Sequence, residues 1–66
     1  MKFKFIGKPN ILYDTLTVNK VYNILQFEKV GKYILVYFID DTNNLLYIPY
    51  ANISKFNQDW RYMEND

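Results

Sequence analysis

The side chains that most often carry out catalysis are missing from this 66-residue chain, which contains neither histidine nor cysteine. The usual proton donor or acceptor near neutral pH and the usual thiol nucleophile are therefore both absent. Asp40 and Asp41 form an adjacent carboxylate pair, but consecutive strand residues point in opposite directions and cannot share a proton. No further acidic residue lies nearby at the spacing of a metal-binding loop. We interpret both aspartates as turn residues.

The hydroxyl side chains give no stronger indication of an enzyme. Ser54 has no base near it in the sequence, and two glycines in the whole chain cannot build a glycine-rich phosphate-binding loop. The sequence therefore predicts a protein that is not an enzyme and that holds no metal and no cofactor.

Lysines interleaved with aromatic residues are the usual material of a surface that binds single-stranded nucleic acid. The five lysines that could gather on one side of the fold are Lys2, Lys4, Lys8, Lys20 and Lys32. The alternative is that they keep edge strands soluble and unpaired. The net charge of +1 does not identify a partner, because it produces neither a strong positive field that would attract a phosphate backbone nor an acidic surface.

Thirteen aromatic residues exceed what the interior of so small a domain can hold beside its aliphatic residues, so some of them must lie at the surface. Tyrosine and tryptophan are frequent anchors of protein interfaces. The candidate partner-binding residues are Tyr13, Tyr47, Tyr50, Trp60 and Tyr62. For Trp60 a second reading is open, in which the ring folds back and caps one end of a barrel.

Short apolar runs broken by Gly, Pro, Asn and Asp predict five strands and two hairpins. The expected strands are residues 2–6, 20–28, 33–39, 45–48 and 54–56, with a single tight turn after Pro49. In the second strand, alternation places Tyr22, Ile24 and Gln26 on one face and Val21, Asn23, Leu25 and Phe27 on the other. The fold class is therefore an all-β, five-stranded antiparallel barrel with a short 3-10 turn near the C-terminus.

The third strand, residues 33–39, is apolar at every position and needs cover on both of its faces. The barrel itself covers only one. The tail around Trp60, Tyr62 and Met63 could supply the rest, or a second copy of the chain could do so, which predicts a homodimer.

The remaining composition indicates one domain, residues 1–56, followed by a tail, residues 57–66. No apolar stretch reaches the 18 or so residues that cross a bilayer, and the first nine residues do not resemble a secretory signal. Together with the absence of cysteine, this leads us to expect a cytoplasmic protein, without disulfides and without a membrane partner.

Two stretches resemble a known family. Residues 16–24, Leu-Thr-Val-Asn-Lys-Val-Tyr-Asn-Ile, are similar to the segment that opens the second strand of small bacterial and phage Src-homology-3-like barrels, and Tyr47-Ile48-Pro49 is similar to their Tyr-x-Pro step. Asn19 stands where the family usually has glycine, a mild departure because asparagine also tolerates left-handed backbone. The resemblance implies a fold and a phage or prophage setting, without a shared activity.

A looser likeness links Tyr13, Pro49 and Tyr50 to the peptide groove of eukaryotic Src-homology-3 domains, although the tandem tryptophans and the acidic loop of that groove are absent. Our leading hypothesis is a binding module that acts on a host protein. The alternative is nucleic-acid binding through the lysines.

Overall fold

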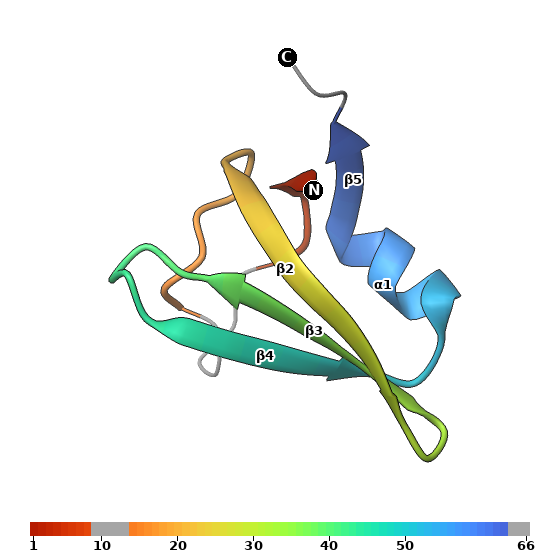
Figure 1. Ribbon diagram of the computed structural model, residues 1–66. Helices are drawn as coiled ribbons and strands as arrows, with labels where there is room; N and C mark the ends of the chain where they lie inside the picture. Colours follow the sequence, from red (N-terminus) through yellow and green to blue (C-terminus); the bar gives the residue numbers. More distant parts are fainter. Residues whose placement is uncertain (9–13, 64–66) are drawn as a thin grey trace.

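The computed structural model describes residues 1–8 and 14–63, which form one antiparallel sheet and one short helix (Figure 1). In chain order the elements are β1 (Lys2–Phe5), β2 (Val21–Val30), β3 (Tyr33–Ile39), β4 (Leu45–Tyr50), α1 (Ile53–Asp59) and β5 (Trp60–Met63). The five strands lie in the order β4-β3-β2-β1-β5. The expectation of a mostly β, five-stranded antiparallel fold is confirmed. The sheet is open, with β4 and β5 as its two edges.

The first four strands lie where the hydrophobic patterns place them. Phe3 and Phe5 of β1 are buried, as the alternation with lysine predicts. The turn between β2 and β3 contains Gly31 at φ 59°, a left-handed conformation that glycine adopts without strain. In the turn between β3 and β4, Asn43 has the same kind of backbone, with φ 65°.

The predicted faces of β2 hold for residues 21–25, and a β-bulge overturns them for Gln26 and Phe27. Ile24 pairs with Phe38 and Gln26 pairs with Tyr37, so Leu25 is the extra residue between them. Ile24 and Gln26 are two residues apart but pair with consecutive residues of β3, so they lie on opposite faces of the sheet and the alternation is reversed after the bulge. Phe27 therefore points inward, with its ring 5.4 Å from that of Phe56. Strict alternation placed it on the opposite face.

The predicted strand at residues 54–56 and the predicted 3-10 turn are both wrong, because this segment forms the α-helix α1. Asn52 caps the helix, and its side-chain oxygen accepts a hydrogen bond from the backbone N–H of Lys55 at 2.9 Å. The cap and the burial of Phe56 favour a helix over a strand, since Phe56 projects from α1 onto the rings of Phe3, Phe27 and Tyr50.

The last strand comes from the segment expected to be a tail. Residues 57–59 end α1, and β5 then pairs with β1 in the register Phe5↔Trp60 and Phe3↔Tyr62. Trp60 is only 2% exposed and packs on the rings of Phe5, Tyr22 and Phe38. The C-terminal segment thus completes the core and extends the sheet at the edge far from β4.

Candidate binding surface

The strands β2, β3 and β4 have one side turned away from the core, which we call the outer face. Residues paired across antiparallel strands lie on the same side of a sheet, so the register defines this face. It consists of Gln26, Glu28, Val30, Tyr33, Leu35, Tyr37, Ile39, Leu45, Tyr47 and Pro49. All except Gln26 and Glu28 are apolar or aromatic. The opposite side of β3 carries Val36 and Phe38, both fully buried.

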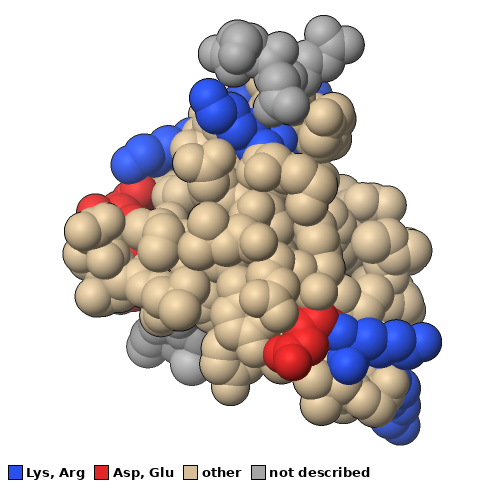
Figure 2. Space-filling model, in the orientation of Figure 1, with Lys and Arg blue, Asp and Glu red and all other residues tan. Residues whose placement is uncertain are grey.

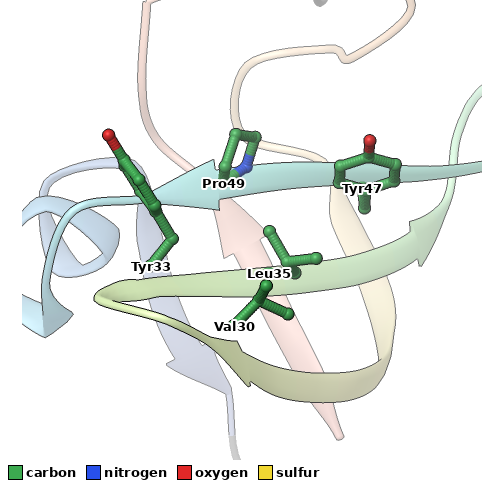
Figure 3. Close-up of a pocket in the computed structure, with 5 residues that line it drawn as sticks. All are labelled: Val30, Tyr33, Leu35, Tyr47 and Pro49. Atoms are coloured by element: carbon green, nitrogen blue, oxygen red, sulfur yellow. The ribbon is translucent and has the colours of Figure 1, made fainter.

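A shallow hollow of about 390 Å³ lies on the outer face, lined by Val30, Tyr33, Leu35, Tyr47 and Pro49. Figure 3 shows these side chains on one side of the sheet, with Val30 from β2, Tyr33 and Leu35 from β3, and the other two from β4. Tyr33 and Tyr47 are about half exposed, at 47% and 55%. The hollow is therefore an open, aromatic depression whose lining carries no charged side chain.

The sequence predicts that the fourth strand ends before Pro49. In the structure this is wrong, because Pro49 lies inside β4. It is tolerated because β4 is an edge strand, where the missing N–H can face away from the sheet. Pro49 is directly opposite Leu35 of β3 in the strand register, so these two residues lie side by side in the lining of the hollow.

The single carboxylate among the outer-face residues is held by a neighbour. The hydroxyl of Tyr37 donates to Oε1 of Glu28 at 2.7 Å, and this hydrogen bond to a carboxylate raises the pKa of Tyr37 above its usual value. The ring of Tyr37 also packs on that of Tyr47, with centroids 5.5 Å apart. Glu28 is opposite Leu35, which lines the hollow, and its carboxylate is hydrogen-bonded to one of the two tyrosines that pack together.

The predicted aromatic anchors are not brought together. Tyr47 is exposed on β4, and Tyr62 is equally exposed, at 56%, on β5 at the other edge of the sheet. Tyr50 and Trp60 are buried, and the Trp60 indole N–H donates to the Tyr50 hydroxyl at 2.8 Å. Tyr13 lies outside the described residues.

The loosely predicted peptide groove is not formed by Pro49 and Tyr50. These two residues are consecutive in β4, so their side chains lie on opposite faces of the sheet, Pro49 exposed and Tyr50 buried. Of the residues that line the hollow, Tyr47 was among the candidate partner-binding residues, and Pro49 was part of the loosely predicted groove. The sequence did contain a signal for Tyr33 and Leu35, which share one face of β3. A strand that is apolar on both faces must expose one of those faces unless something else covers it.

The candidate lysines are also spread out. Figure 2 shows the basic residues in separate groups at the margins of the visible face, with a broad uncharged area between them. Lys2 and Lys4 lie on β1, Lys8 lines a separate hollow beside Asp59, and Lys32 lies in the β2–β3 turn. Lys4 is directly opposite Arg61 of β5, a basic neighbour that the sequence did not reveal.

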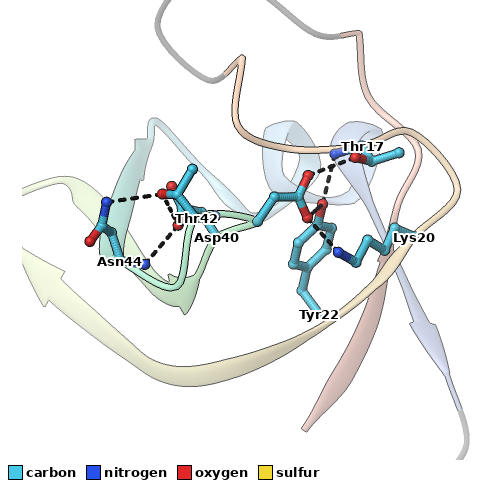
Figure 4. Close-up of polar contacts among 7 residues, drawn as sticks. Thr17, Lys20, Tyr22, Asp40, Thr42 and Asn44 are labelled. Atoms are coloured by element: carbon cyan, nitrogen blue, oxygen red, sulfur yellow. Dashed lines mark hydrogen bonds and ion pairs between the residues drawn. The ribbon is translucent and has the colours of Figure 1, made fainter.

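Lys20 is engaged with Asp41, which accepts three hydrogen bonds (Figure 4). The donors are the Thr17 hydroxyl at 2.6 Å, the Lys20 ammonium at 2.6 Å and the Tyr22 hydroxyl at 2.8 Å. These bonds, that from Lys20 first, lower the pKa of Asp41 from 3.8 to about 2. Asp41 thus joins the β3–β4 turn to the loop before β2.

Asp40 has a different set of partners, and the two carboxylates do not meet. Its Oδ1 accepts from the backbone N–H groups of Thr42 and Asn44 at 3.0 and 2.8 Å and from the Thr42 hydroxyl at 2.8 Å. The interpretation of both aspartates as turn residues agrees with these contacts.

Within residues 1–8 and 14–63, no three His, Cys, Asp or Glu side chains are grouped so that they could hold a metal ion. None of the helical segments in the same part of the chain has the length and apolar character that a bilayer crossing requires. Comparison of the chain with protein-family models, with curated proteins and with solved structures finds no match.

Proposed function

We propose that this chain is a small Src-homology-3-like barrel that acts as a non-enzymatic protein-binding module, with the outer face as its binding surface. The observation that carries the proposal is the aromatic hollow between Tyr33 and Tyr47, which lies over Leu35 and Pro49. The largest exposed apolar patch on a soluble monomer often coincides with an interaction site.

The character of the hollow supports a protein partner. Half-exposed tyrosines offer rigid apolar area together with a hydroxyl, which suits the centre of a protein interface. The outer face carries a single charged side chain, Glu28, so it offers little attraction to a polyanion. The hollow is also open and shallow, whereas a small molecule is usually buried in a deeper cleft.

For the partner we propose a host protein of a phage-encoded module. The support for this part is the resemblance of residues 16–24 and of the Tyr-x-Pro step to phage and bacterial barrels. The strand order β4-β3-β2-β1-β5, with the short helix α1 before the last strand, is compatible with such a barrel.

Two tyrosines provide a matched test. Tyr47 and Tyr62 are equally exposed, each lies on an edge strand, and each packs against one aromatic neighbour, Tyr37 and Phe3 respectively. The tagged protein, Tyr47→Lys and Tyr62→Lys are used in parallel to capture proteins from a bacterial lysate. We expect Tyr47→Lys to capture at least about tenfold less of the specific partner than the wild type does, and Tyr62→Lys to capture as much as the wild type. Capture that is absent, or that both variants lose equally, would reject the outer face as the binding surface.

Nucleic-acid binding is a second candidate because β1 and β5 place Lys4 directly opposite Arg61, with Lys2 two residues further along the same side. Like charges at opposite positions destabilise a sheet unless an anion lies between them. A gel-shift assay at low salt compares the wild type with Arg61→Gln, using Lys32→Gln as the control from the distant turn. Binding that weakens for Arg61→Gln and falls steeply with salt would support this candidate. No shift with single- or double-stranded DNA or RNA would reject it.

A further inference from the structure

Neither the C-terminal strand β5 nor helix α1 covers the outer face. The C-terminal segment, one of the two expected covers, instead pairs with β1 as β5, at the edge of the sheet opposite β4. Helix α1 packs on the other side of the sheet, where Phe56 contacts Phe3, Phe27 and Tyr50 in the core. In the part of the chain that the structure describes, the outer face therefore leaves Tyr33, Leu45 and Tyr47 about half exposed or more, whereas its other β3 residues are half-buried.

The edge of the sheet beside this face is poorly suited to pairing with an added strand. Pro49 offers no N–H along β4, and proline in an edge strand is a common means of preventing edge-to-edge association. A partner is therefore expected to pack on the face of the sheet. Face-to-face packing of two sheets about 10 Å apart is the usual way in which such a surface is covered.

The face is compatible with a copy of itself. Its one charged side chain is Glu28, so like-charge repulsion between two such faces is limited to a single pair of carboxylates. The face also combines a depression with the adjoining ring pair of Tyr37 and Tyr47. A surface that has both a hollow and projecting rings can be complementary to itself across a two-fold axis.

The exposed area lies at the lower limit for a weak dimer. A fully covered tyrosine buries on the order of 150–250 Å², so the half-exposed Tyr33 and Tyr47 each leave about 100 Å² open. Val30 and Leu45, 49% and 60% exposed, bring the open apolar area to about 400–500 Å² per copy. Two copies together approach the roughly 1,000 Å² at which specific interfaces begin.

We propose that the outer face of β2, β3 and β4 packs against the same face of a second copy of this chain in a two-fold, concentration-dependent homodimer. This inference rests on the proposed role of the outer face as a binding surface and adds a second copy of the chain as a partner beside the proposed host protein. Because the area is near the lower limit, the dimer dissociates readily, and the same face is then open to a different protein.

The test measures the mass of the wild-type protein by sedimentation velocity and light scattering between about 10 μM and about 1 mM, a range that spans weak association. We expect the average mass to rise toward twice that of the monomer. Tyr47→Lys and Leu45→Lys, both at exposed positions, are expected to raise the dissociation constant at least about tenfold. Tyr62→Lys is expected to dimerise like the wild type. Substitutions at Val36 or Phe38 would be uninformative, since both side chains are in the core.

Backbone amide NMR spectra of the same samples locate the contact. Concentration-dependent shifts confined to the outer-face residues of β2, β3 and β4 would support the inference, and shifts confined to β1 and β5 would overturn it. A wild type that remains monomeric over the whole range would also overturn it. In that case, capture of another protein that still depends on Tyr47 would leave the proposed function in place, whereas loss of both would reject the two together.

Discussion

The indole N–H of Trp60 donates a hydrogen bond to the Tyr50 hydroxyl at 2.8 Å, and that hydroxyl donates to Oδ2 of Asp59 at 2.8 Å. Tyr50 is the last residue of β4, Asp59 the last of α1 and Trp60 the first of β5. The three side chains therefore join the ends of three elements at one point. A buried N–H needs such a partner, because leaving it without one costs about 1–3 kcal/mol.

Tyr50→Phe is expected to lower the free energy of unfolding by about 1–3 kcal/mol, since it removes the acceptor of the Trp60 indole N–H and the donor to Asp59. Urea unfolding followed by tryptophan fluorescence measures the change. The control is Tyr47→Phe, because the Tyr47 hydroxyl lies on the exposed outer face. Equal stability of the two variants would contradict the assigned role of this hydroxyl.

The bulge at Leu25 leads to a prediction that strict alternation does not make. Phe27 packs on Phe3 and Phe56, whereas Leu25 is 55% exposed. We expect Phe27→Ala to cost about 1–2 kcal/mol, less than for a fully buried phenylalanine, and Leu25→Ala to cost less than about 0.5 kcal/mol. Chemical denaturation of both variants tests this. Similar losses would mean that the two side chains share a face, as the unbroken strand pattern had indicated.

Asp41 makes stability depend on pH in the acidic range. Its pKa is about 2 in the folded protein, below the ordinary value of 3.8, because Lys20, Thr17 and Tyr22 donate to its carboxylate. A lowered pKa stabilises the fold above the unfolded-state pKa, near 4, and that contribution is lost as the pH falls toward 2. The Lys20 side chain is 53% exposed, so solvent screens the interaction. We therefore expect ionised Asp41 to contribute about 1 kcal/mol to the free energy of unfolding at neutral pH.

Asp41→Asn should therefore be less stable than the wild type at pH 7 and should reach nearly the same stability at pH 2. Thermal unfolding of the two proteins at intervals between pH 7 and pH 2 gives the comparison. A constant difference across this range would show that the carboxylate charge is not what stabilises the contact.

Asn19 adopts left-handed backbone, with φ 72°, and its N–H donates to the carbonyl of Phe5 at 2.7 Å. Asn19→Gly is expected to change stability by less than about 0.5 kcal/mol, whereas Asn19→Ala should lose about 1 kcal/mol because a Cβ without a polar group disfavours this conformation. Melting temperatures of the two variants distinguish these effects. An alanine variant as stable as the glycine variant would rule out the conformational explanation.

Local pattern was sufficient for much of the fold. The alternation of lysine and phenylalanine located β1, the uninterrupted apolar run located β3, and the polar turn residues between strands located both hairpins. The left-handed backbone of Asn19 agrees with the resemblance, in which this position is usually glycine. These features depend on neighbours within a few positions, and such information is written directly in the sequence.

Other features depended on contacts between distant segments. Ser54–Phe56 has no strong preference of its own, and it becomes helical where the Asn52 cap and the contacts of Phe56 with Phe3 and Tyr50 favour that conformation. The bulge at Leu25 reverses the faces of β2 with no glycine or proline to mark it. Trp60 is buried because β5 pairs with β1, almost sixty residues earlier in the chain.

The binding surface shows the same division. The sequence by itself determined that β3 must have two apolar faces and that some tyrosines must be exposed, because both statements follow from composition and strand period. Only the tertiary structure decided which tyrosines these are. The pairing of β3 with β4 brings Tyr33 and Tyr47 around Leu35 and Pro49, while the core takes Tyr50 and Trp60 because their polar atoms hydrogen-bond to each other there.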